Sequence, residues 1–176
     1  MTAEPSAVTV DEVAAEATYA LRGAVLRPDG GEIVWAGDED PATFHLAART
    51  SDGRIVGVVR FSPASCPWRP EARAPWQLRG MATDTGVRGA GAGRALVAEG
   101  LTRLAARGGD LLWCDARMAA VGFYERMGFT VVTESFDKPG IGPHLGMVKD
   151  LAPLTPRQLG ASLRTRPERP GGNRSS

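Results

Sequence analysis

The feature that most constrains the fold is a glycine-rich segment, VRGAGAGRAL at residues 87–96, which separates an expected strand at 76–83 from an expected helix. Small and apolar residues recur along that helix at the spacing of one face: Leu96, Val97, Gly100, Leu101 and Leu104. Alternating glycines let backbone N–H groups approach a ligand closely, and a helix N-terminus favours phosphate. The segment therefore indicates either a site for a phosphate-bearing ligand or a turn that only lets helix and strand pack.

Two common nucleotide-binding motifs do not fit this segment. A P-loop requires G-x-x-x-x-G-K-[ST], but Gly91 is followed by Ala92 and Gly93 where lysine and a hydroxyl residue are needed. A Rossmann fingerprint requires G-x-G-x-x-G, and the position of its third glycine holds Arg94 or Leu96, depending on where the pattern starts.

The pattern Arg88-x-x-Gly91-x-Gly93 instead resembles the R/Q-x-x-G-x-G/A motif of the GNAT acyltransferases. Residues 78–83 resemble the strand before that motif, and residues 116–129 resemble the family's later A-x-x-F-Y-x-x-x-G-F segment. The two blocks occur in the family's order and at about its spacing. The resemblance covers roughly residues 10–151.

Other residues refine this resemblance or depart from it. Residues 140–144, followed by Met147, resemble the G-I-P-H-x-x-M segment of the ElaA-like branch, with Gly142 as an extra residue. Arg117 stands where many members carry an asparagine that contacts the cofactor, so that contact is not carried over. The strand at 76–83 has no glutamate, which some members use there as a general base.

The resemblance implies a GNAT fold, a single α/β domain in which helices flank a mixed, mostly antiparallel twisted sheet. It implies acetyl-CoA as the acyl donor and a primary amine of a small molecule or peptide as the acceptor. The acetyl group would move directly, in a ternary complex without an acyl-enzyme. An alternative is a non-catalytic acyl-CoA-binding or sensor domain, and another is an interaction module whose tail binds an acidic partner. The expectation leaves a homodimer open.

The resemblance also implies which residues bind the donor and which one protonates the leaving group. The thioester and pantetheine would bond to the strand backbone at Met81, Ala82 and Thr83. The pyrophosphate would bind the turn: Arg88, Gly89, Ala90, Gly91, Ala92, Gly93 and Arg94. Arg88 and Arg94 are alternatively solvated arginines at a helix start. Tyr124 matches the tyrosine of the F-Y pair, commonly a general acid toward the CoA sulfur, or is simply an aromatic on a buried stripe.

The general base is not indicated by any motif, so the histidines are the first candidates. His45 lies in an expected strand and is interpreted as a packing residue. His144 follows Pro143, whose fixed φ would set its direction, and is expected either to serve the acceptor, as base or binder, or to order the loop before it. Glu134, Asp137 or a chain of waters are the alternatives.

Composition excludes several other classes. The chain has 176 residues, about one domain, and 43% of them are hydrophobic, which is typical of a globular protein. It shows no secretory-signal pattern and no apolar run near the roughly 18 residues that cross a bilayer. Cys66 and Cys114 are isolated, so we expect no metal, no disulfide and a cytoplasmic setting, and Cys114 is a poor candidate nucleophile.

Charge divides the chain into two parts. After Asp150 there are five arginines and one glutamate, which together give a charge of +4. Because the net charge of the whole chain is +1, residues 1–150 have a net charge of −3. An acidic body makes nucleic acid a poor partner. We expect residues 1–151 to form the GNAT domain and residues 152–176 to be a basic tail, disordered because it cannot bury enough apolar surface.

The other elements follow from periodicity and turn residues. Thr9 and Glu12 have capping-box spacing and predict a helix from Thr9 to about Arg27. Expected strands lie at 44–49, 55–61, 111–115, 129–136 and 144–149, and a helix at 117–127. The loop with Trp35 and Asp38-Glu39-Asp40 either binds a cationic amine or is a solvated acidic loop.

Overall fold

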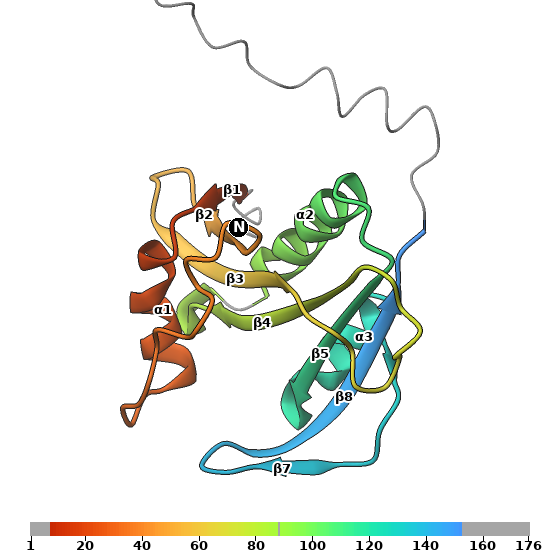
Figure 1. Cartoon of the computed structure of the whole chain (residues 1–176). Helices are drawn as coiled ribbons and strands as arrows, with labels where there is room; N and C mark the ends of the chain where they lie inside the picture. The colour runs from red at the N-terminus through yellow and green to blue at the C-terminus, as the bar shows by residue number, and fades with distance from the viewer. Residues whose placement is uncertain (1–7, 88, 153–176) are drawn as a thin grey trace, which may run out of the picture.

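The computed structural model describes residues 8–87 and 89–152, and Figure 1 shows a twisted sheet flanked by helices. Within these residues the sheet has eight strands in the order β1-β2-β3-β4-β5-β8-β6, with β7 also paired to β8. The strands are β1 Thr9–Val13, β2 Phe44–Arg49, β3 Ile55–Pro63, β4 Pro75–Thr83, β5 Leu111–Arg117, β6 Thr130–Val131, β7 Phe136–Lys138 and β8 Gly142–Asp150. The helices are α1 Glu16–Leu26, α2 Ala92–Ala106 and α3 Val121–Arg126, with 3-10 turns η1 Thr85–Val87 and η2 Met118–Ala120. Of these strand pairs β4–β5 is parallel and the others are antiparallel, which confirms the predicted α/β fold class.

Some expectations fall outside this range. The predicted basic tail at 152–176 lies, except for Ala152, outside the described residues, and so does Arg88 of the glycine-rich motif. No described helix is long and apolar enough to cross a membrane.

The two faces of the sheet are covered by different helices, because successive side chains of a strand point to opposite faces. Helix α2 packs on the face that carries Leu46, Val59 and Leu78, and α3 extends the same core. Helix α1 covers the other face, where Leu21 and Val25 meet a smaller cluster made of Ala47, Val58 and Ala82. The sheet is thus the middle layer of three, and a ligand held within it can be reached from either side.

Strand β4 carries the irregularity that matters most for function. Val58 pairs with Ala82 and Arg60 with Arg79, so Gly80 and Met81 together oppose Val59 in a β-bulge. Gly80 takes a φ of +66°, which favours glycine. On its other edge β4 pairs with β5 only from Pro75 to Gln77, and Figure 1 shows the two strands diverging beyond that point.

The predicted N-terminal helix was partly wrong. Residues Thr9–Val13 form β1, antiparallel to β2, and the helix begins only at Glu16, with Ala15 in place of Thr9 as its N-cap. The local capping signal is overridden because Val10 and Val13 each pack against a hydrophobic cluster when the segment is extended. The free edge of β2 also supplies backbone partners for β1.

The predicted strand at 129–136 is interrupted. Its first part, β6, leaves the ladder of β8 after Val132, because the N–H of Gly146 donates to the side-chain oxygen of Thr133 over 2.8 Å. Pairing resumes at Phe136, opposite His144. The expected helix at 117–127 also starts later, since Arg117 still belongs to β5. The other predicted strands and the helix after the glycines are confirmed.

Gly100 of α2 provides a test of this packing. A Cβ added there would lie 2.2 Å from Cζ of Phe61, so we expect Gly100→Ala to lower the free energy of unfolding by about 1–3 kcal/mol. Gly23→Ala in α1 is the matched control, because its Cβ would meet Ile33 at an ordinary 3.5 Å and alanine favours helix by about 0.5–1 kcal/mol. Urea unfolding of both variants measures these two changes in the free energy of unfolding, which should have opposite signs. Equal changes in the two variants would contradict the packing described.

Candidate active site

A cleft of about 730 Å³ opens where β4 and β5 diverge. It contains most residues that the sequence nominated, from β4, the glycine-rich turn, α3 and β8: Met81, Ala82, Thr83, Gly89, Gly91, Ala92, Gly93, Arg94, Tyr124 and His144. Ala90 does not line it, because its N–H bonds back to the carbonyl of Val87. Three distant parts of the sequence thus meet in one cleft.

The first turn of α2 forms one end of the cleft. Its first helical hydrogen bond runs from Ala95 N to Gly91 O, so the N–H groups of Ala92, Gly93 and Arg94 have no helical acceptor. Among the described residues no side chain caps this helix, and the N-cap, Gly91, takes a φ of +83°. These donors and the positive end of the helix dipole make this end suitable for phosphate.

Glycines keep this turn open. A Cβ at Gly91 would meet no atom within 4 Å, so the space beside its backbone is free. A Cβ at Gly93 would lie 3.3 Å from Cζ of Phe123, which packs against the turn from α3. The turn therefore leaves space beside its free N–H groups for an anionic group such as a phosphate.

The edge of β4 supplies a second set of backbone groups. Because pairing with β5 stops at Gln77, the N–H and C=O groups of residues 78–83 that face β5 have no strand partner among the described residues. An extended ligand that carries amides can bond to such an edge as another strand would. The pantetheine arm of CoA has this character.

Tyr124 lies on the α2 side of the sheet, where it is buried among Phe123, Phe129 and Cys114. Burial, and secondarily the nearby thiol of Cys114, raise the pKa of its hydroxyl well above the ordinary value, so Tyr124 keeps its proton at neutral pH. Burial also raises the pKa of Cys114, which opposes the thiolate that a nucleophile needs.

His144 approaches the cleft from the opposite face. Met147 of β8 points to the core that contains Tyr124, so the alternation of the strand sends His144 to the other face, with Val148. Its Nδ1 lies 2.8 Å from the carbonyl oxygen of Gly142 and must carry the proton, since that oxygen only accepts. The lone pair of its ring is therefore on Nε2.

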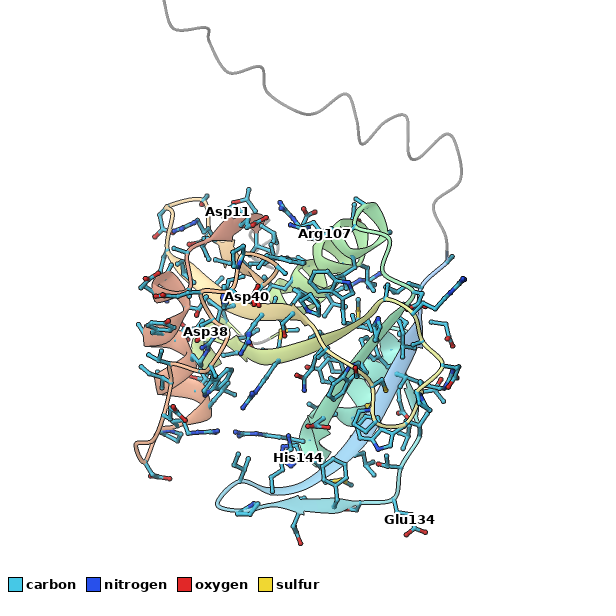
Figure 2. All side chains as sticks on the ribbon, viewed as in Figure 1. Asp11, Asp38, Asp40, Arg107, Glu134 and His144 are labelled. Atoms are coloured by element: carbon cyan, nitrogen blue, oxygen red, sulfur yellow. The ribbon has the colours of Figure 1, made fainter. Side chains whose placement is uncertain are left out.

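The alternative bases lie elsewhere. Glu134 and Asp137 are exposed and do not line the cleft, and Figure 2 shows Glu134 at the periphery, away from His144. His45 is buried in β2, with Nε2 2.9 Å from the carbonyl oxygen of Asp38, and its pKa is lowered by burial. It packs in the sheet, as predicted.

In the acidic loop, Asp38 is held in buried ion pairs and is not free to bind an amine. Asp38 is buried and pairs with Arg22 at 2.8 Å and with Arg60 at 3.3 Å, and it also accepts the N–H of Trp35 at 2.9 Å. Figure 2 shows it beside α1, inside the fold. Neither predicted role of this loop, amine binding or a solvated acidic surface, included a buried carboxylate. The sequence feature that could have indicated it is Arg22. This charged residue lies on the buried face of α1 and therefore needs a buried partner of opposite charge.

Four arginines that line the cleft were missed as site residues. Arg27 follows α1, Arg79 lies on β4, Arg117 ends β5 and Arg126 lies on α3. Arg79 could have been found from strand alternation, because Trp76 and Leu78 face the α2 core and Arg79 then faces the other side.

Comparison with known proteins identifies the family. The family model described as "Acetyltransferase (GNAT) family" matches residues 10–129. The chain belongs to the GNAT acetyltransferases. This GNAT enzyme is 38% identical over 144 residues to "Uncharacterized N-acetyltransferase YitI" of Bacillus subtilis (strain 168), covering 81% of this chain and 95% of that protein.

Solved structures show the same fold. ElaA of Escherichia coli superposes with a TM-score of 0.66 at 19% identity, covering 81% of this chain and 99% of that one. An aminoglycoside 6'-N-acetyltransferase complexed with coenzyme A superposes with a TM-score of 0.64 at 16% identity, covering 84% and 99%. The predicted family and enzyme class are confirmed, and this GNAT enzyme is an acyltransferase.

The buried carboxylate gives a stability prediction. Asp38→Asn should lower the free energy of unfolding by about 3–5 kcal/mol, because it leaves the buried guanidinium groups of Arg22 and Arg60 without a counter-charge. Glu39→Gln, next to it but exposed, is the control and should change stability by less than about 0.5 kcal/mol. Denaturant unfolding measures both, and a small effect at Asp38 would argue against the buried ion pairs.

Proposed function

We propose that this GNAT enzyme transfers an acetyl group from acetyl-CoA directly to a primary amine of a small molecule or peptide. The observation that carries the proposal is a single cleft joining the open N-terminus of α2, the unpaired edge of β4 and two proton-transfer groups on opposite faces of the sheet. That arrangement suits a ternary complex, since donor and acceptor can enter from different sides.

The donor would lie along β4. Its pyrophosphate would bind the free N–H groups at the start of α2, together with Arg94 and, by the sequence motif, Arg88. Its pantetheine amides would bond to the backbone of Met81, Ala82 and Thr83, which brings the thioester to the bulge. No acyl-enzyme is needed, and the buried thiol of Cys114 is unsuited to form one.

The chemistry requires two proton transfers. The acceptor's neutral amine nitrogen attacks the thioester carbonyl carbon, and Nε2 of His144 takes the proton that this nitrogen loses as the C–N bond forms. As the C–N bond forms, the C–S bond breaks, and the departing sulfur takes the proton of the Tyr124 hydroxyl. Tyr124 then regains a proton from solvent and His144 releases one, so the enzyme returns to its starting state.

Direct binding and turnover test this proposal. Calorimetric titration should show acetyl-CoA binding, and release of free CoA thiol should then depend on an added amine. Binding without transfer to any amine in a broad panel would favour the alternative, a non-catalytic acyl-CoA sensor. The presence of both Tyr124 and His144 in the cleft favours catalysis over that alternative.

Tyr124→Phe tests the general acid. We expect kcat to fall by about 10²- to 10⁴-fold while the Kd for acetyl-CoA stays nearly constant, because the ring contacts with Phe123 and Phe129 are kept and only the hydroxyl is lost. Tyr19→Phe, which removes the other tyrosine hydroxyl outside the cleft, is the control. A fall of less than about threefold in kcat would leave Tyr124 a packing residue.

His144→Gln tests the general base. The variant should lose about 10²-fold or more of its activity together with the acid limb of the kcat/KM pH profile, because glutamine cannot accept a proton from the amine. The change of kcat/KM at higher pH that comes from the amine substrate itself should remain in both the wild type and the variant. His45→Gln removes the other histidine and should keep the acid limb. An intact limb in His144→Gln would assign proton removal to water.

A further inference from the structure

The acceptor side of the cleft is built from arginines on three elements. Arg27 and Arg117 meet at one point, since both guanidinium groups donate to the carbonyl oxygen of Leu26, over 2.9 and 3.3 Å. Arg79 reaches the same side from β4 and lies 4.4 Å from the ring centre of Trp35. Figure 2 shows nitrogen-tipped side chains entering the space between α1 and the His144 side of β8.

These charges are not neutralised locally. The acidic residue that lines this side, Asp115, forms an ion pair with Lys138. Within the described part of the chain, Arg27, Arg79 and Arg117 form no ion pair with a carboxylate. Burial and then the charge of Arg22 lower the pKa of Arg79, and burial and then Arg27 lower the pKa of Arg117. The cluster therefore favours an anion and repels a cation.

The wall behind the cluster is rigid and adds positive charge. Trp35 is buried between two guanidinium groups, with Arg22 4.1 Å from its ring centre on the inner side and Arg79 on the cleft side. A Cβ at Gly80 would lie 2.7 Å from Trp35, so the ring packs directly on the bulge. Behind it the single carboxylate of Asp38 faces both Arg22 and Arg60.

The cluster is too far from the phosphate end to serve the donor's pyrophosphate. Arg79 precedes the bulge, and a strand rise of about 3.3 Å per residue places it about 13 Å along β4 from Thr83, beside the glycine-rich turn. Arg117 pairs in register with His144, the proposed base. The anion would therefore be bound next to the site of proton removal.

We propose that the acceptor is an amine that also carries a carboxylate or phosphate group, which binds to the guanidinium groups of Arg27, Arg79 and Arg117 while its amino group faces His144. The proposal rests on the acetyl-transfer function above and specifies its substrate class. Planar guanidinium groups match both anions with paired hydrogen bonds. It also excludes polyamines and other purely cationic amines as good substrates, contrary to the acidic-loop hypothesis.

Matched acceptor pairs test the proposal by turnover. Comparing the turnover of tyrosine with that of tyramine measures the effect of a carboxylate. Comparing O-phosphoethanolamine with ethanolamine measures the effect of a phosphate. In at least one pair we expect the anionic member to have a kcat/KM higher by about 10-fold or more. Equal or better turnover of the members that lack the anionic group, or of spermidine, overturns the proposal.

Arg79→Gln locates the effect. It should lower kcat/KM for the preferred anionic acceptor by about 10- to 100-fold, mainly through KM, and should change kcat/KM for the counterpart that lacks the anionic group by less than about threefold. Arg73→Gln, with the same charge change on an exposed residue outside the cleft, should behave as the wild type. A variant that weakens acetyl-CoA binding by the same factor would assign Arg79 to the donor and overturn the proposal.

A binding measurement separates this inference from the acetyl-transfer function. The same amine pairs are titrated calorimetrically into enzyme saturated with CoA, where no transfer occurs. Binding of the anionic members that is lost in Arg79→Gln supports the inference even if no amine is acetylated. Failure of both anionic members to bind overturns it, even if acetyl transfer to another amine is observed.

Discussion

The separation of β4 from β5 is the constraint on which the functional architecture depends. The two parallel strands pair from Pro75 to Gln77, and the bulge at Gly80 and Met81 then bends β4 away. Among the described residues this leaves a row of β4 backbone groups that face β5 without a strand partner. Backbone N–H and C=O groups that are shielded from water without a hydrogen-bond partner are destabilising. A ligand with amides along its length can therefore pair with this edge. The glycine-rich turn lies at the end of the same strand, which aligns the proposed phosphate site with the edge proposed to bind the pantetheine amides.

A second consequence is that the cleft passes through the sheet. Tyr124 belongs to the α2 side and His144 to the α1 side, because strand alternation in β8 sends His144 and Met147 to opposite faces. The proposed general acid for the leaving thiol and the proposed general base for the amine are thereby kept apart. Burial keeps Tyr124 protonated, and the hydrogen bond of Nδ1 to Gly142 leaves Nε2 of His144 with its lone pair. Tyr124 and His144 both line the cleft, and their different surroundings suit them to these two different roles.

The acceptor side is organised by Asp38, although this residue does not line the cleft. By pairing with Arg22 and Arg60 it fixes the loop that carries Trp35, and Trp35 in turn supports Arg79. A buried carboxylate thus holds the rigid wall against which the cationic cluster stands. The charge of this wall is the basis of the proposed preference among amines, which the family fold alone does not specify.

The sequence by itself determined the family and the fold class, and it predicted the donor half of the site. Those features are local: three glycines at a strand-to-helix junction, an F-Y pair on a helix, and periodic apolar residues each act within a few turns of chain. Tertiary structure decided the rest, since each remaining feature depends on a partner distant in sequence. Thr9–Val13 became a strand because β2 offered a free edge, overriding a capping box. Asp38 became structural because Arg22 and Arg60 converge on it from a helix and a strand. Arg27, Arg79 and Arg117 formed one cationic site only when three elements brought them together, and no spacing along the chain encodes that meeting.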